Sequence, residues 1–291
     1  SRLLLGLGGE EVKFLAAVLQ LNGSSDVEGN WRQMEELARA AAARGARWIG
    51  TPENTNYLGP HAEKARRAEP LSGPTIRRFS ELVASLGVHF LLGSYNEAVD
   101  VPTRCANTSV WFGPDGSILA TYRKIHLFDI DHAAGGAGGV SFRESDTCLP
   151  GTDVVVASTT LGACGLSICY DLRFGELYRA LVERGAELLA VPSAFTAVTG
   201  RDHWEPLLRA RAIESQAYVL APAQWGKHDD GGLQQSYGHA MIVDPWGQVV
   251  ASVPDGVGYA IAEIDLERVR SIRRAMPLAD HRKLPSNSFH G

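Results

Sequence analysis

The sequence predicts an α/β protein that folds as a four-layer α-β-β-α sandwich in one domain. The main reason is a faint internal duplication. RGARWIGTP at 44–52 is matched by RGAELLAVP at 184–192, and each copy is typical of a helix end followed by a short apolar strand that stops at a proline. Two halves that each carry helices on one sheet face would bury their free sheet faces against each other.

Two further pairs of segments extend the duplication. GVHFLLGSYNE at 87–97 and QAYVLAPAQWG at 216–226 are both typical of buried strands. GPDGSILATY at 113–122 and DPWGQVVASV at 244–253 both indicate a tight turn that enters an outer strand. Each half therefore runs through a helix, a strand, a second helix, a second strand and a hairpin.

Single segments fit this order. KFLAAVLQL at 13–21 predicts a strand, NWRQMEELARAAAARG at 30–45 an amphipathic helix, and WEPLLRARAIESQ at 204–216 a second helix with its apolar residues at helical spacing. The glycine-rich run AAGGAGG at 133–139 joins two sequence blocks and indicates a mobile loop.

The first residues are left out of this fold prediction. Residues 1–11 contain no signal-peptide core, and we interpret them as a leader or an expression remnant. Residues 12–291 are then expected to form a single domain, with no linker between the halves.

Composition excludes several classes of protein. With 45% hydrophobic and 21% charged residues, the 291-residue chain can bury a core without metals or disulfides. The net charge is −5 and basic runs are short, which argues against a nucleic-acid partner or a polybasic membrane contact. No apolar run is long enough for a membrane span. Cys105, Cys148, Cys164 and Cys169 form no C-x-x-C pair, so we expect a reducing cytoplasm.

Cys169 is the first candidate for chemistry. In LGACGLSICYDLRFGELY at 161–178, an apolar strand ends at this cysteine and an amphipathic helix begins a few residues later. The thiol is thereby placed at a strand-to-helix turn whose backbone N–H groups point outward, which can lower its pKa and provide an oxyanion site. The alternative is a buried core cysteine, which is our interpretation of Cys164.

Two more polar residues follow predicted strands. Glu53 in TPENTNYLG comes directly after a strand and a proline, where the duplication places Ser193 in the second half, and it could serve the thiol as a general base. Lys124 in YRKIHLFDID lies between an outer strand and an apolar run, where an ammonium can stabilise a developing oxyanion. The alternatives are a solvated loop acid and a surface charge.

The same stretch supports a rival hypothesis, a metal-dependent hydrolase. His126, Asp129, Asp131 and His132 have the right ligand chemistry, but their spacing matches no H-x-x-x-H or H-E-x-x-H pattern, and we predict no metal. The sequence also lacks the G-x-x-x-x-G-K-[ST] loop of a P-loop NTPase and the G-x-S-x-G elbow of a serine hydrolase.

Taken in chain order, Glu53, Lys124 and Cys169 resemble the catalytic Glu-Lys-Cys triad of the nitrilase, or carbon–nitrogen hydrolase, superfamily. The resemblance covers roughly residues 12–280. It implies a sandwich of the nitrilase type, with Cys169 as nucleophile, Glu53 as general base, Lys124 as oxyanion stabiliser and Glu144 of SFRES as an additional active-site carboxylate. No cofactor is implied.

Other segments resemble the Nit branch of that superfamily. SFRES at 141–145, PSAFTAVTGRDHWEPLLRARAIESQ at 192–216 and SYGHAMIVDPWG at 236–247 follow its pattern. Within the branch, the AQWGKH segment is closest to the type that hydrolyses the amide of deaminated glutathione to 2-oxoglutarate and cysteinylglycine through a cysteine thioester. An ω-amidase acting on 2-oxoglutaramate and a catalytically silent binding protein of the same fold are the alternatives.

The implied substrate is a small-molecule amide that bears a 2-oxo acid. Arg173, four residues past the nucleophile, can hold its carboxylate in a bidentate pair, with a structural ion pair as the alternative. Phe195 and Thr199 would line the same mouth from the PSAFTAVTG loop, and a backbone N–H near Tyr170 would meet the oxyanion. The resemblance also suggests a homodimer or higher homo-oligomer. Gly175 departs from the family pattern, in which proline is usual, and the glycine-rich loop is longer than expected.

Overall fold

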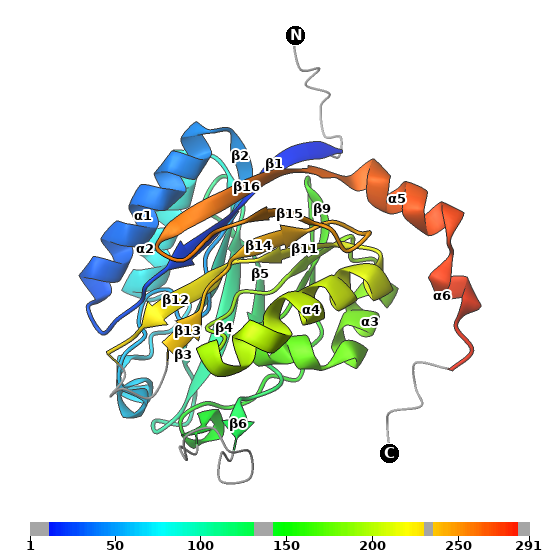
Figure 1. Cartoon of the computed structure of the whole chain (residues 1–291). Coiled ribbons are helices and arrows are strands. Elements are labelled where there is room, and N and C mark those ends of the chain that lie inside the picture. The colour runs from blue at the N-terminus through cyan, green and yellow to red at the C-terminus, as the bar shows by residue number, and fades with distance from the viewer. Residues whose placement is uncertain (1–11, 131–141, 230–234, 285–291) are drawn as a thin grey trace.

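A computed structural model describes residues 12–130, 142–229 and 235–284, and it confirms the four-layer sandwich (Figure 1). Two sheets pack face to face, and helices cover the outer face of each one. One sheet carries α1 (Val27–Ala43) and α2 (Pro74–Leu86), and the other carries α3 (Gly175–Glu183) and α4 (Ala197–Ser215).

The two halves of the chain build sheets of the same design. The first half contributes β1 (Lys13–Leu21), β2 (Ala46–Gly50), β3 (His89–Ala98), β4 (Cys105–Phe112) and β5 (Ile118–Arg123), and β16 (Gly258–Asp265) from near the end of the chain joins their sheet beside β1. The second half contributes β8 (Val156–Thr159), β9 (Gly162–Leu166), β10 (Leu188–Ala190), β11 (Tyr218–Ala221), β14 (Met241–Val243) and β15 (Val249–Ser252).

Strand order and direction agree between the halves. The orders are β16-β1-β2-β3-β4-β5 and β8-β9-β10-β11-β14-β15. In each, the first pairing is antiparallel, the next two are parallel and the last two are antiparallel. The predicted duplication is therefore present in the fold.

The helices that precede β2 and β10 also end in the same way. After α1 the chain passes through Gly45 with φ of 91°, and after α3 it passes through Gly185 with φ of 93°. A side chain on either residue would be strained in this left-handed conformation, so the glycine of each RGA motif is needed to turn the helix into its strand.

One segment differs from the prediction. QAYVLAPAQWG was expected to form a single buried strand, but it forms β11 in the second sheet and β12 (Ala223–Lys227) in the first, with Pro222 between them. The start of β12 runs parallel to the end of β1, and β13 (Gln235–Tyr237) pairs with β12. The proline has no N–H for a sheet ladder, and the chain changes sheets there.

Alternation along β1 divides the core into two clusters. Ala17 and Leu19 pack in a cluster with Met34 of α1 and Phe79 of α2, whereas Val18 packs in a cluster that includes residues of both sheets and of α3 and α4. Successive strand residues point to opposite faces, so a strand buried on both faces is apolar along its whole length. This explains why KFLAAVLQL shows no polar alternation.

The remaining elements are short or lie at the end of the chain. They are the strands β6 (Asp129–Ile130) and β7 (Phe142–Arg143), the 3₁₀ turns η1 (His61–Glu63), η2 (Ala65–Arg67), η4 (Glu144–Asp146) and η5 (Cys169–Arg173), and the helices α5 (Leu266–Ala275) and α6 (Leu278–His281).

Three of the predictions need comment. The leader at 1–11 and the glycine-rich loop at 133–139 lie outside the described residues. The PSAFTAVTG segment is not a loop throughout, because α4 begins at Ala197 and Thr199 stands in its first turn. Within the ranges that the structure describes, no helix is long and apolar enough to cross a membrane.

Candidate active site

The turn after β2 carries Glu53 close against β3. The N–H of Thr51 donates to the carbonyl oxygen of Leu91 at 2.9 Å, and the N–H of Gly93 donates to the Thr51 hydroxyl at 2.9 Å. A Cβ atom at Gly93 would overlap the carbonyl oxygens of Thr51 and Pro52. Glycine at this position therefore lets the Glu53 turn lie directly on the neighbouring strand.

The Glu53 carboxylate is buried and fully engaged. Its Oε1 accepts hydrogen bonds from Lys124 Nζ at 2.8 Å and from Asn107 Nδ2 at 2.9 Å. Its Oε2 accepts from the backbone N–H of Ala194 at 2.9 Å. Lys124 follows β5 and Ala194 follows β10, so the carboxylate connects the two halves of the sandwich.

Glu144 in η4 is the second carboxylate of the cluster. Its Oε2 accepts from Lys124 Nζ and from the Phe128 N–H, both at 2.8 Å, and its Oε1 accepts from Asn107 Nδ2 at 2.9 Å. Lys124 and Asn107 thus each bridge the two acids, which fixes the distance between them. Only 2% of the Lys124 side chain is exposed.

Mutual attraction keeps this buried cluster charged. Burial alone would lower the pKa of Lys124, but the charges of Glu144 and Glu53 outweigh it and raise that pKa well above its usual value. Burial alone would raise the pKa of Glu144, but Lys124 and then Lys64 outweigh it and lower that pKa to about 2. The ammonium and the Glu144 carboxylate therefore both stay ionised at neutral pH.

Cys169 stands in a strained backbone conformation at the start of η5. Its φ is 48°, in the left-handed region that few residues with a side chain adopt, and its N–H donates to the carbonyl oxygen of Pro192 at 3.0 Å. The next N–H, that of Tyr170, belongs to the first turn of a 3₁₀ helix and has no partner within that helix. This geometry offers a backbone donor beside the thiol.

The thiol pKa differs from the prediction. Burial raises the pKa of Cys169 well above its usual value, the charge of Glu53 raises it further, and Lys124 only partly opposes them. The expectation of a lowered pKa at this turn was wrong, because the turn is buried and its N–H donors do not compensate for lost solvation. The free thiol keeps its proton and needs a base to react.

Asp171 fastens the cysteine turn to the lysine segment. Its Oδ2 accepts from the Tyr122 hydroxyl at 2.7 Å and from the N–H of Ile168 at 2.8 Å. Its Oδ1 accepts from the N–H of His126 at 3.0 Å. A single buried carboxylate thus holds the residues next to Cys169 against the residues next to Lys124.

The residues of the metal hypothesis do not assemble in the described structure. His126 Nδ1 lies 2.8 Å from Asp171 Oδ1, and Asp129 is exposed. Asp131 and His132 lie outside the described residues. Across residues 12–130, 142–229 and 235–284, no group of three potential ligands could hold a metal ion.

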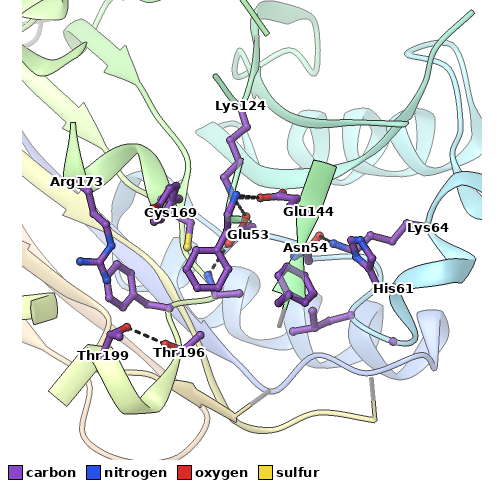
Figure 2. A pocket seen from close by; sticks show the side chains of 17 residues that line it. Glu53, Asn54, His61, Lys64, Lys124, Glu144, Cys169, Arg173, Thr196 and Thr199 are labelled. Carbon is purple, nitrogen blue, oxygen red and sulfur yellow. Dashed lines mark hydrogen bonds and ion pairs between the residues drawn. The ribbon is translucent and has the colours of Figure 1, made fainter. Parts of the chain in front are cut away.

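All eight residues predicted for the site line one cavity, so residues from distant segments meet there (Figure 2). Their individual roles remain predictions. The eight are Glu53, Lys124, Glu144, Cys169, Tyr170, Arg173, Phe195 and Thr199.

Arg173 lies at one end of this cavity. Its guanidinium stands 5.0 Å from the ring centre of Phe195 and 5.8 Å from that of Tyr170, and its Nη1 lies 3.1 Å from Nδ1 of His203. Among the described residues, no carboxylate forms an ion pair with it, so the alternative of a structural ion pair has no partner there. The guanidinium can therefore donate hydrogen bonds to the carboxylate of a ligand.

Sequence reasoning missed four polar residues of the site. Asn107 binds both carboxylates from the middle of β4, and Asn54, His61 and Lys64 line the far end of the cavity. Asn54 directly follows Glu53, which was a usable signal. Lys64 lies in the charged segment HAEKARRAE, which is typical of a solvated surface.

Neither the other cysteines nor Gly175, which departs from the family pattern, disturbs the site. The described cysteines are all free, and Cys164 is buried inside β9 as predicted. Gly175 is the first residue of α3, where a proline would also be accepted. A Cβ there would come no nearer than 3.3 Å to the flexible Arg211 guanidinium, so this departure from the family pattern does not disturb the turn.

A thiol, a carboxylate and an ammonium in one buried cluster can perform nucleophilic chemistry on a carbonyl group. The carboxylate can take the thiol proton, and the ammonium with the Tyr170 N–H can stabilise the negative oxygen of a tetrahedral intermediate. The cationic end at Arg173 favours an anionic substrate.

Comparisons with known proteins agree with this chemistry. Residues 15–274 match the sequence profile of the carbon-nitrogen hydrolase family. A protein from Bos taurus named deaminated glutathione amidase is 42% identical over 274 residues, which cover 92% of this chain and 82% of that protein. A Synechocystis protein of the same name is 41% identical over 92% of this chain and 98% of its own length. The crystal structure of Saccharomyces cerevisiae Nit3, a member of branch 10 of the nitrilase superfamily, has a TM-score of 0.83 and 30% identity, and the match covers 94% of this chain and 98% of that one.

Proposed function

Since the chain belongs to the carbon–nitrogen hydrolase family, we propose that it hydrolyses the amide bond of deaminated glutathione to 2-oxoglutarate and cysteinylglycine. The family makes it a hydrolase of carbon–nitrogen bonds in amides, and the name shared by the bovine and Synechocystis relatives supports the substrate. The observation that carries the proposal is the buried cluster in which Lys124 Nζ lies 2.8 Å from Glu53 Oε1, in the cavity that Cys169 also lines.

The first half-reaction forms a thioester. The Cys169 sulfur attacks the amide carbonyl carbon while Glu53 takes the thiol proton, and the carbonyl π electrons move to oxygen. Lys124 has three N–H donors, of which Glu53 and Glu144 occupy two, so the third is free for the oxyanion beside the Tyr170 N–H. The C–N bond then breaks, and Glu53 returns its proton to the departing amine of cysteinylglycine.

The second half-reaction releases the acid. Glu53, again a carboxylate, takes a proton from water as the hydroxyl oxygen adds to the thioester carbonyl. The C–S bond breaks, the thiolate recovers the proton from Glu53, and 2-oxoglutarate leaves. The raised thiol pKa fits this cycle, because the sulfur stays protonated until Glu53 accepts its proton.

We assign to Glu144 and Asn107 the role of positioning the Lys124 ammonium and the Glu53 carboxylate. Asn107 Nδ2 lies 2.9 Å from a carboxylate oxygen of each acid, and Glu144 holds the Lys124 ammonium at 2.8 Å, as Glu53 does. Both keep the lysine from turning away when Glu53 becomes neutral during the reaction.

We assign to Arg173 the binding of the 2-oxo acid carboxylate of the acyl group. This residue lies on η5 with Cys169, so its guanidinium is close to any group esterified on the sulfur. Phe195 and Tyr170 pack around the guanidinium and restrict its orientation. Phe195 and Thr199 line the same cavity as Arg173.

The experiment uses two substrates that share one acyl group. Deaminated glutathione and 2-oxoglutaramate both acylate the enzyme with the 2-oxoglutaryl group, and they differ only in the amine that leaves. Mass spectrometry should find equimolar 2-oxoglutarate and cysteinylglycine from the first substrate. Acid-quenched enzyme should carry a 2-oxoglutaryl adduct on the Cys169 peptide. Preference for 2-oxoglutaramate in kcat/KM would replace the proposal with an ω-amidase, and absence of turnover on both would reject it.

We also propose that the protein forms a homodimer, as the family resemblance suggests. The partner subunit would support the site from behind the helix that follows Cys169. The second-half surface exposes large apolar side chains at Ile213 of α4 and at Trp246 in the β14–β15 turn, which suit a protein contact. Sedimentation of an active species at the monomer mass of 31.4 kDa would contradict this assembly.

A cytoplasmic location is proposed from the chemistry of the site. Four free cysteines, one of them the proposed nucleophile, are typical of proteins from a reducing compartment. Cell fractionation that finds the protein in an oxidising compartment would overturn this location.

A further inference from the structure

Lys64 is a buried cation that the mechanism above does not use. It lies between η1 and η2, is 5% exposed and lines the cavity. Within the described part of the chain, its ammonium makes one hydrogen bond, to Asn54 Oδ1 at 3.4 Å, and no ion pair within 4.0 Å. That bond is longer than a normal hydrogen bond between nitrogen and oxygen. Lys124, by contrast, has two carboxylate oxygens at 2.8 Å.

A buried ammonium with unused donors destabilises the free protein. The cost of leaving a charged group without partners is several times that of a neutral one, and it disappears when an anion binds. Burial lowers the pKa of Lys64, but the charges of Cys148, Glu144 and Glu53 outweigh this and keep that pKa above its usual value. Lys64 is therefore charged and faces the cavity with donors to spare.

The two hydrogen-bonding residues beside Lys64 in the cavity, Asn54 and His61, are polar and neutral. Burial and then the Lys64 charge lower the pKa of His61 to about 4, so the imidazole is uncharged at neutral pH. Its Nε2 lies 2.8 Å from the Thr147 hydroxyl, and Asn54 contributes its amide. One cation with neutral hydrogen-bonding neighbours is an environment that suits a single carboxylate.

Lys64 and Arg173 lie at opposite ends of the cavity. Figure 2 shows Arg173 on one side of Cys169, with Glu53 on the other side and the group of Asn54, His61 and Lys64 beyond it. The leaving nitrogen must reach Glu53 to collect its proton, so the departing group extends from Cys169 past Glu53, toward Lys64.

We propose that Lys64, with Asn54 and His61, binds the carboxylate of the departing dipeptide and so selects amides whose amine carries a terminal acid. The inference rests on the proposed function and adds a second anion site to it. Deaminated glutathione has one carboxylate on a short acyl arm and another on the longer dipeptide arm. Arg173 shares η5 with Cys169 and suits the short arm, whereas Lys64 comes from a separate segment and suits the longer one.

The test compares deaminated glutathione with its glycinamide derivative, which lacks only the distal carboxylate. Wild-type enzyme should prefer the acid by about 10- to 100-fold in kcat/KM, mainly through KM, as expected for one charge-assisted contact. Lys64→Met removes the charge and keeps an unbranched apolar stem, and it should abolish most of this preference. Lys64→Arg should restore part of it.

A matched control separates this contact from a general loss of charge. Lys13→Met removes a lysine that pairs with Asp265 on the surface, and it should keep the wild-type preference. If Lys64→Met instead lowers the rates on the acid and the amide equally, the lysine acts through Glu144 or through folding, and the inference fails while the proposed function stands. Wild-type enzyme that turns over neither compound would overturn both.

A second measurement needs no variant. Cysteinylglycine should inhibit wild-type hydrolysis of 2-oxoglutaramate competitively, and cysteinylglycinamide should bind at least tenfold more weakly. Equal inhibition by the acid and the amide would overturn the assignment even if Lys64→Met did not fold.

Discussion

The turn after β2 and the turn after β10 occupy equivalent places in the two halves, and their backbones are held alike. The N–H of Thr51 donates to Leu91 of β3 at 2.9 Å, and the N–H of Val191 donates to Leu220 of β11 at 2.9 Å. A proline follows in both turns, at residues 52 and 192. The next residue differs, because it is Glu53 in the first half and Ser193 in the second.

The two turns contribute different parts of the site. The first presents a carboxylate that accepts three hydrogen bonds. In the second, the Ser193 hydroxyl bonds within its own turn, to Val191 at 3.2 Å, while the carbonyl of Pro192 holds the N–H of Cys169. In the proposed mechanism, a repeated scaffold thus supplies the base from one copy and the backbone support of the nucleophile from the other, and neither half holds a complete site.

Removing the proposed nucleophile tests the contribution of the second half. Cys169→Ala should reduce turnover of deaminated glutathione below detection, because the variant lacks the sulfur that would form the thioester. The change removes one sulfur at a turn, so the far-UV spectrum and the melting temperature should stay close to wild type. Measurable turnover by this variant would reject the thioester mechanism.

Glu53→Gln tests the first-half turn. We expect kcat to fall by roughly 10²–10⁴, since general base catalysis is lost and an amide N–H would face donors from Lys124, Asn107 or Ala194. Ser193→Ala is the matched control, because it alters the equivalent residue of the other half, and it should change kcat by less than about threefold. Similar losses in both variants would contradict the division of labour between the turns.

Lys124→Arg should lower kcat by about two orders of magnitude. A planar guanidinium cannot place one donor on each carboxylate and a third on the oxyanion within the same buried space. Steady-state kinetics on both amide substrates would measure the loss. Near-wild-type turnover would mean that the charge of Lys124 matters and its geometry does not.

The smallest expected effect concerns stability where the halves meet. His89 of β3 accepts a hydrogen bond from Trp111 Nε1 at 3.2 Å and lies 3.0 Å from the Thr160 hydroxyl of the second half. Burial and then the charge of Arg47 lower its pKa to about 4. The unfolded state binds a proton below about pH 6.5 and the folded state does not until about pH 4, so stability falls as pH falls through this window.

Tyr218 of β11 is the equivalent residue of the second half, and it accepts from the N–H of Asp265 at 3.4 Å without titrating in acid. His61 has a similarly lowered pKa and contributes its own share, so His89→Gln should remove roughly 1–2 kcal/mol of the stability that denaturant unfolding finds lost between pH 7 and pH 5. Tyr218→Phe should keep the wild-type pH dependence. An unchanged pH dependence in His89→Gln would assign the acid sensitivity elsewhere.

Local sequence patterns predicted the scaffold because each of its helix ends, turns and buried strands is encoded within a few consecutive residues. The RGA motifs, the prolines after β2 and β10, and the apolar strand 13–21 each report a backbone requirement within a few residues. The change of sheet at Pro222 has no such signal. QAYVLAPAQWG is one apolar run, and β12 joins the first sheet by pairing with the distant residues Gln20 and Leu21 at the end of β1.

The residues of the site likewise divide into those that local sequence patterns reveal and those that they do not. Glu53 and Cys169 follow strands, and together with Lys124 they form a recognisable order. Asn107 stands inside β4 and Lys64 in a charged segment, and the contacts that show their roles are with residues ten or more positions away. The thiol pKa also depends on burial by distant elements, which explains why the turn alone suggested the wrong direction.

The pairing of β1 with β16 has a consequence for protein synthesis. The register joins Lys13 to Asp265 and Gln20 to Gly258, so one edge of an early strand is completed by one of the last. A ribosome adds about 5–20 residues per second, which leaves that edge open for on the order of tens of seconds. We therefore expect the nascent chain to expose an unpaired apolar strand throughout most of translation, a state in which binding by a chaperone protects it from aggregation.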